Sequence, residues 1–204
     1  GYSCIPACTL GRMTEFLEAL HFALAQPTIL IIFSALVGLI FGGFATVAGD
    51  RLGQLAAAED EGRELEEEMG LWWPASRCEG CGRSLNAIER MPGFGWFAVR
   101  GQCSSCGFKV PISAPVTEWL CALLFALIAL RYGPNWSTLA YMFAAWCYVT
   151  MSLSDLKHMT LPDRLTYPLI WGGLIAAASG LLPISASYSI FGAAAGFAFL
   201  WILQ

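Results

Sequence analysis

Three long stretches of the sequence contain no Asp, Glu, Lys or Arg, and this absence constrains the fold more than any other feature. They cover residues 19–49, 132–154 and 165–204, and only Glu118 interrupts a fourth stretch at 110–130. Uncharged apolar stretches of about 18 or more residues are typical of transmembrane helices. Helices are expected because lipid offers the backbone no hydrogen-bond partner, so each segment must satisfy its own N–H and C=O groups.

The composition of the chain agrees with a membrane protein. Of the 204 residues, 57% are hydrophobic and 13% are charged, and the mean hydropathy is +0.60. Soluble globular domains usually contain about 25% charged residues. This composition excludes a disordered chain, a basic nucleic-acid-binding protein and an ordinary soluble enzyme. We therefore predict an all-α polytopic membrane protein without a nucleic-acid partner, with about five transmembrane helices at residues 27–48, 114–131, 136–154, 165–182 and 188–204.

The basic residues indicate how such a protein is oriented. If the segments alternate in direction, residues 50–113 and 155–164 lie on the same side of the membrane, and they contain nine of the eleven Lys and Arg residues. Lys and Arg accumulate in cytoplasmic loops of membrane proteins. We therefore predict that both stretches are cytoplasmic.

Four of the eight cysteines form two Cys-x-x-Cys pairs, each followed by a glycine that permits a tight turn. Two such knuckles supply four thiolates in a tetrahedron, a closed arrangement typical of structural zinc. Redox or disulfide pairs and an iron–sulfur cluster are the alternatives, although stable disulfides are disfavoured in a cytoplasmic loop. We predict a structural zinc ion that folds this small loop domain. Its ligands would be Cys78, Cys81, Cys103 and Cys106.

The remaining cysteines receive no function. Cys121 and Cys147 lie in predicted membrane segments and are expected to be buried, small apolar residues. Cys4 and Cys8 could pair with each other, but they lie in the N-terminal tail of residues 1–26. Because Met13 would be a natural start, we expect residues 1–12 to be non-native.

Several carboxylates lie at the ends of the predicted membrane segments, where ionisable groups are candidates for function. Asp155 ends the third segment, and Asp163 follows it after a short turn. Position alone favours a simpler interpretation, in which both mark the water boundary and Asp163 caps the next helix. Asp50 would form a surface ion pair with Arg51, and Glu118 could face the bundle interior.

Taken together, these motifs resemble the type IV prepilin peptidases of bacterial pilus and type II secretion systems. The resemblance covers about residues 38–196 and includes Arg51-Leu52 at the end of the first helix. It continues through the two cysteine knuckles and Glu118, and ends with Asp155 and the sequence Leu-Pro-Asp at 161–163.

This resemblance implies a membrane aspartic endopeptidase that cleaves the leader peptide of prepilins or pseudopilins at the cytoplasmic face of the bacterial inner membrane. It also implies N-methylation of the new N-terminus with S-adenosylmethionine as donor. Asp155 matches the first catalytic aspartate of the family, and the four cysteines match its zinc-type site. The implied organisation is a tail at 1–26, a first transmembrane helix at 27–48, a cytoplasmic zinc-binding domain at 49–113 and a membrane peptidase domain at 114–204.

One part of the family pattern has no match. Aspartic proteolysis needs two carboxylates that share a proton. The second catalytic aspartate of the family lies in a Gly-x-Gly-Asp motif after two further membrane segments, but residues 165–204 contain no Asp or Glu. We expect a C-terminally truncated sequence whose 204 residues are inactive alone and whose parent is active. A degenerate paralogue, a zinc-ribbon membrane adaptor and a small transporter component remain as alternatives.

Overall fold

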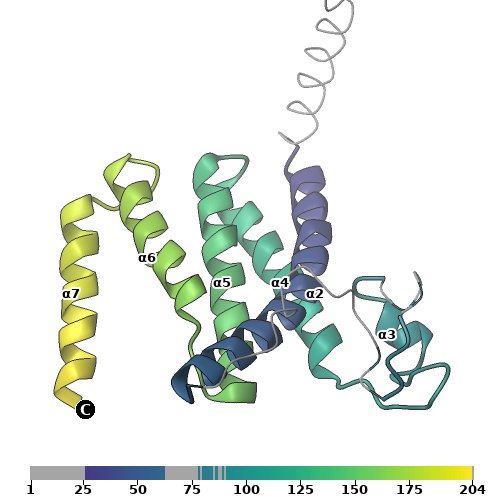
Figure 1. Ribbon diagram of the computed structural model, residues 1–204. Coiled ribbons are helices and arrows are strands. Elements are labelled where there is room, and N and C mark those ends of the chain that lie inside the picture. The colour runs from purple at the N-terminus through teal and green to yellow at the C-terminus, as the bar shows by residue number, and fades with distance from the viewer. Residues whose placement is uncertain are drawn as a thin grey trace, which may run out of the picture.

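The computed structural model describes residues 26–62, 78, 80–84, 86, 89 and 91–203, and the regular secondary structure within them is helical, with an isolated β-bridge between Gln102 and Lys109. The predicted tail with Cys4 and Cys8 lies outside the described residues. Figure 1 shows the long helices standing side by side in chain order, with the short α3 beside the lower part of α4. The helices are α2 (Pro27–Asp60), α3 (Gly95–Ala98), α4 (Ser113–Tyr132), α5 (Trp136–His158), α6 (Asp163–Ala178) and α7 (Ala186–Leu203).

Each predicted membrane segment corresponds to a helix, but the first helix is longer than predicted. α2 has 34 residues and continues to Asp60 instead of ending at residue 48. Its second half, blue in Figure 1, bends away from the first and runs across the lower end of α5. The sequence predicts an end at residue 48 because Asp50 and Arg51 resemble a water boundary. In the structure α2 continues past them, and Asp50 pairs with Lys157 and His158 at the end of α5.

Two of the described helices, α2 and α4, are long and apolar enough to cross a membrane. α7 contains a shorter apolar stretch, Ala186–Phe199. Most side chains described along α7 are exposed, including Phe191 and Trp201, and they form a surface that lipid would cover. That α5, α6 and α7 also cross the membrane stays a prediction.

Small residues let α2 pack closely against α4. Ser34, Gly38 and Gly42 recur every four residues on one face of α2, and all three are buried. A Cβ atom at Gly38 would lie 2.7 Å from the Cα of Ala122, and one at Gly42 would lie 2.5 Å from the Cα of Glu118. Stripes of small residues allow helix backbones to approach in this way in membrane proteins. The contact therefore fixes the register of α2 against α4.

Trp146 of α5 anchors the other side of α2. Its ring stacks on Phe44 with centroids 5.5 Å apart, and its Nε1–H donates to the carbonyl of Phe41 at 3.0 Å. Cys121 and Cys147 are buried in the same bundle, as predicted for small apolar residues. Because α5 is held against α2, the C-terminal end of α5 and the turn that follows have a defined position.

Candidate metal centre and membrane-edge carboxylates

The two cysteine knuckles have the same backbone hydrogen bonds. In the first, the N–H of Cys78 donates to the carbonyl of Arg83 at 2.9 Å, and the N–H of Gly82 donates to the carbonyl of Cys78 at 2.8 Å. The second knuckle repeats both bonds at 2.8 and 2.9 Å, through Cys103, Phe108 and Gly107. Both glycines have a left-handed φ, +68° and +72°, which glycine adopts without strain. The glycine after each pair therefore has the role in the turn that its position predicted.

The knuckles bring the four sulfur atoms together. All four Sγ atoms lie within 4.8 Å of one another, and those of Cys78 and Cys106 are 3.7 Å apart. This distance is far too long for a disulfide, in which the sulfurs are about 2.05 Å apart. It is close to the separation of about 3.8 Å between thiolates in a tetrahedral site with metal–sulfur bonds of about 2.3 Å. The cluster is therefore able to bind a metal ion.

The pKa values of two thiols in the cluster are shifted in opposite directions. The backbone N–H groups of Ser105 and Cys106 lower the pKa of Cys103 to about 6. For Cys106, the N–H of Phe108 acts in the same direction, but burial and the neighbouring sulfurs, that of Cys81 foremost, raise its pKa to about 12. Four thiolates at this spacing repel one another, and a bound cation removes that repulsion.

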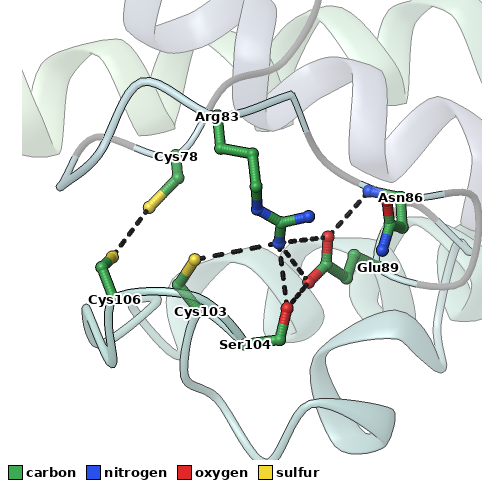
Figure 2. Close-up of polar contacts among 7 residues, drawn as sticks. All are labelled: Cys78, Arg83, Asn86, Glu89, Cys103, Ser104 and Cys106. Carbon is green, nitrogen blue, oxygen red and sulfur yellow. Dashed lines mark hydrogen bonds and ion pairs between the residues drawn. The ribbon is translucent and has the colours of Figure 1, made fainter.

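A polar network next to the sulfurs joins the two knuckles (Figure 2). Arg83, from the first knuckle, donates to Glu89 at 2.7 and 3.0 Å and to the hydroxyl of Ser104, in the second knuckle, at 2.9 Å. The Nη2 atom of Arg83, which donates all of these bonds, lies 3.9 Å from the Sγ of Cys103. The Asn86 N–H and the Ser104 hydroxyl, together with Arg83, lower the pKa of Glu89 to about 2. Sequence reasoning missed this network, because no spacing rule relates its members.

The loop that carries the cysteines is docked on the membrane helices through Gly93. Glu118 accepts a hydrogen bond from the N–H of Gly93, and Trp119 donates from Nε1 to the carbonyl of the same residue at 3.2 Å. Gly93 has a φ of +79°, and a Cβ there would lie 3.0 Å from a methyl group of Leu39 in α2. Glu118 thus makes the hydrogen bond expected for a carboxylate that faces the protein interior, and its partner comes from the loop.

Asp155 is exposed, one turn before the end of α5. Its backbone carbonyl accepts a hydrogen bond from Met159, whose left-handed φ of +56° ends the helix. Within the described part of the chain, the Asp155 carboxylate makes no hydrogen bond or ion pair. It is therefore open to water and to any ligand at this end of α5.

The second half of α2 holds the end of α5 through Asp50. The Nζ of Lys157 donates to Asp50 Oδ1 at 3.2 Å, and the Nε2 of His158 lies 3.0 Å from the same oxygen. The Thr160 hydroxyl donates to the carbonyl of Gly53 at 3.2 Å, just after the end of α5. Asp50 therefore joins two helices through Lys157 and His158, where the sequence predicts a surface ion pair with Arg51.

Asp163 begins α6, directly after the N-cap residue Pro162. Its expected role as the cap is wrong, because Pro162 occupies the cap position and makes no side-chain cap hydrogen bond. Asp155 and Asp163 therefore stand at opposite ends of one short turn. In the described residues, no hydrogen bond or ion pair joins this turn to the four-cysteine loop, so the two candidate sites are separate.

Comparison with protein families covers most of the chain. Residues 36–132 match the family described as the bacterial peptidase A24 N-terminal domain. Residues 141–204, which include Asp155, match the type IV leader peptidase family. The chain belongs to this prepilin leader peptidase family. The first match contains the four cysteines and Glu118, and the second contains the Asp155–Asp163 turn.

Curated relatives from several bacteria carry the name prepilin leader peptidase/N-methyltransferase. The chain is 32% identical to the protein of Aeromonas salmonicida, over 94% of this chain and 68% of that protein. It is 31% identical to the protein of Stutzerimonas stutzeri, over 89% and 66%, and 40% identical to that of Aeromonas hydrophila, over 71% and 49%. The chain thus spans between half and about two thirds of these relatives of the leader peptidase family. No solved structure matches it.

Proposed function

We propose that this chain is the membrane part of an aspartic endopeptidase that removes the leader peptide of type IV prepilins or pseudopilins. The observation that carries the proposal is Asp155, which lies in the segment matched to the type IV leader peptidase family and is exposed at the end of α5. The name of these relatives, prepilin leader peptidase/N-methyltransferase, supports the substrate class.

In this proposal Asp155 is one of two carboxylates that activate water against the scissile carbonyl. A prepilin carries an apolar helix within the bilayer, preceded by a short leader. A carboxylate at the end of a membrane helix can reach that junction without extraction of the substrate helix. Asp50, Lys157 and His158 would hold this end of α5 in place, while the side chain of Asp155 stays exposed.

The second carboxylate of the dyad is not assigned to a residue of this chain. Residues 165–204, which follow the Asp155–Asp163 turn, contain neither Asp nor Glu. Asp50 is engaged with Lys157 and His158, so it is unsuited to share a proton with Asp155.

We assign the four-cysteine cluster to a structural zinc ion, because the sulfur separation and the closed set of four thiolates suit that metal. A zinc ion bound there would hold the two knuckles together through its four sulfur ligands. It would take no part in chemistry at Asp155. The protein's own part is to align Cys78, Cys81, Cys103 and Cys106 through the paired backbone turns and the Arg83 network.

We further propose that α5, α6 and α7 cross the bilayer together with α2 and α4, in the inner membrane, with residues 49–113 as the cytoplasmic zinc-binding domain and 114–204 as the membrane peptidase domain. The basic loops support this orientation. The relatives' name also supports N-methylation. The donor that the family resemblance implies is S-adenosylmethionine, and no residue of this chain is assigned to it.

The proposal is tested by prepilin cleavage in membranes. The assay compares three proteins. They are the 204-residue chain, the full protein translated from the reading frame that encodes this chain, and an Asp155→Asn variant of that full protein. We expect cleavage by the full protein, a loss of roughly a thousand-fold or more in the variant, and no cleavage by the 204-residue chain. An Asp60→Asn variant, which changes an exposed carboxylate at the end of α2, is the control and should cleave normally.

Cleavage that persists in the Asp155→Asn variant would contradict the assignment of Asp155. A zinc-ribbon adaptor would behave differently in the same series. Its partner binding would be lost when the cysteines are changed to serine and would be indifferent to Asp155→Asn.

A further inference from the structure

Exposed apolar side chains form a row on the outer face of the turn that contains α3. Met91, Phe94 and Phe97 are three residues apart and are 54%, 55% and 56% exposed. The N–H of Gly95 donates to the carbonyl of Met91 at 2.8 Å and that of Ala98 to the carbonyl of Phe94 at 3.0 Å, so a tight turn at Gly93 leads directly into α3. Met91 precedes this turn, Phe94 is the N-cap residue of α3, and Phe97 lies within α3. We call these three side chains the 91–97 ridge.

The side chains of the 91–97 ridge cannot pack into the interior of the loop, because Trp96 already occupies that side of the turn. The Nε1–H of Trp96 donates to the carbonyl of Val110 at 3.1 Å. The ring of Trp96 also covers Gly101, where a Cβ atom would lie 2.6 Å from it. The loop therefore keeps its apolar interior on one side and presents the ridge on the other.

The ridge is continuous with the exposed apolar face of α4. The ring of Phe94 meets that of Trp119 edge to face, with centroids 5.9 Å apart. Val116, Trp119 and Leu123 are exposed and spaced three and four residues apart, so they lie on one face of α4. Because α4 is one of the two helices able to cross a membrane, this face is the one that lipid would cover. Figure 1 places α3 beside the N-terminal part of α4, not beyond its end.

Basic residues predominate in the sequence around the ridge, and the carboxylate of Glu118, which accepts from Gly93, is engaged with the backbone. Residues 90–112 contain Arg90, Arg100 and Lys109 and no acidic residue. Arg100 and Lys109 are both exposed. Basic residues near a membrane surface are attracted to anionic lipid headgroups, and aromatic side chains favour the interfacial zone. Both the apolar and the charged features of this turn thus match an anionic leaflet.

We propose that the 91–97 ridge inserts into the interfacial zone of an anionic phospholipid leaflet beside α4 and anchors the four-cysteine loop to the bilayer surface. An element of this kind lies in the plane of the interface, with its apolar side chains among the upper acyl chains. The hydrogen bonds between Gly93 and α4 fix the depth of the ridge. The inference holds whether or not the chain takes part in peptide cleavage.

The test places a genetically encoded, environment-sensitive fluorescent amino acid at Phe97 in the full 204-residue chain. The labelled chain is reconstituted in vesicles of phosphatidylcholine, or of an equal mixture of phosphatidylcholine and phosphatidylglycerol, with brominated lipid as quencher. We expect roughly a two-fold or greater loss of fluorescence in the mixed vesicles, and a smaller loss in phosphatidylcholine alone. The same label at Gln102, an exposed polar position of the same loop, is the matched control and should not be quenched.

A second variant tests the charge contribution without disturbing the ridge. The double substitution Arg100→Gln and Lys109→Gln should make quenching at position 97 equal in the two kinds of vesicle. Quenching at Phe97 no stronger than at Gln102 would overturn the proposal. Quenching of the unsubstituted chain that is equal in both vesicles would overturn the choice of anionic lipid. Aqueous iodide quenches a label that is exposed to water. If the label at position 97 is protected from iodide only after a prepilin is added, the ridge is a protein-docking surface instead.

Discussion

Glu118 accepts a hydrogen bond from the backbone N–H of Gly93, while the next residue, Trp119, satisfies the carbonyl of the same glycine. Two consecutive side chains of α4 thus pair both backbone groups of one loop residue. A carboxylate in a membrane helix needs a hydrogen-bond partner, and so do the backbone groups of an irregular segment beside that helix. The contact between Glu118, Trp119 and Gly93 supplies both. The four-cysteine loop and α4 are therefore expected to behave as one unit.

Substitution of Gly93 should release the loop from the membrane helices. In Gly93→Ala, the new Cβ would be strained at φ +79° and would lie 3.0 Å from Leu39. We expect a local destabilisation of about 1–3 kcal/mol, seen as faster hydrogen exchange across 91–112 with unchanged exchange in α5. Gly133→Ala is the control, since Gly133 also has a left-handed φ, +69°, but has nothing near its Cβ position. Equal acceleration of exchange in 91–112 by both variants would argue against docking through Gly93.

The close approach of α2 and α4 predicts different outcomes for two similar glycine substitutions. A Cβ at Gly42 would lie 2.5 Å from the Cα of Glu118, so Gly42→Ala must push the helices apart. We expect a loss of about 1–3 kcal/mol, as for other overpacked cores, measured as a lower thermal unfolding temperature in detergent. Gly196→Ala in α7 meets nothing within 4 Å and should leave that temperature unchanged or raise it slightly. If the two variants unfold at the same temperature, the α2–α4 contact is looser than described.

Features encoded locally could be predicted from the sequence. The uncharged stretches located all five long helices, because each helix needs only an apolar segment of sufficient length. The Cys-x-x-Cys-Gly spacing predicted two turns that bring four sulfurs together, because each knuckle closes through its own backbone.

Features that depend on contacts between distant segments could not be predicted. The extension of α2 beyond residue 48 is stabilised by Lys157 and His158, more than 100 positions away along the chain. The link of Arg83 to Ser104 and the pairing of Gly93 with Glu118 likewise join segments whose proximity only the fold determines. A charged residue such as Asp50 therefore does not by itself show where a helix ends.

Arg83 should increase the metal affinity of the four-cysteine cluster without being a ligand. It joins the knuckles through Glu89 and Ser104 and lies 3.9 Å from the sulfur of Cys103. Loss of partners that orient metal ligands typically costs about 10- to 100-fold in affinity. We expect that weakening for Arg83→Gln, measured by competition with a chromogenic zinc chelator on the full chain.

The control for this measurement is Lys109→Gln, which removes an exposed positive charge from the same loop. It should retain the zinc affinity of the parent chain, because Lys109 belongs to neither the knuckle contacts nor the Arg83 network. A Cys103→Ser variant should lose stoichiometric zinc altogether. If Arg83→Gln and Lys109→Gln lower the zinc affinity equally, the loss reflects the overall charge of the loop and not the Arg83 network.

Two side-chain pairs that join α2 to the end of α5 and the start of α6 should differ in their contribution to stability. Asp50 pairs with His158, with side chains 32% and 20% exposed, whereas Glu59 pairs with Arg164, with side chains 66% and 62% exposed. Exposed pairs contribute about 0–1 kcal/mol, whereas hydrogen bonds to charged groups shielded from water contribute about 1.5–3 kcal/mol. We therefore expect Asp50→Asn to accelerate hydrogen exchange across 155–163 and Glu59→Gln to leave it nearly unchanged. A matching effect from Glu59→Gln, or none from Asp50→Asn, would mean that packing at Gly53 and not the Asp50 pair holds the turn that carries Asp155.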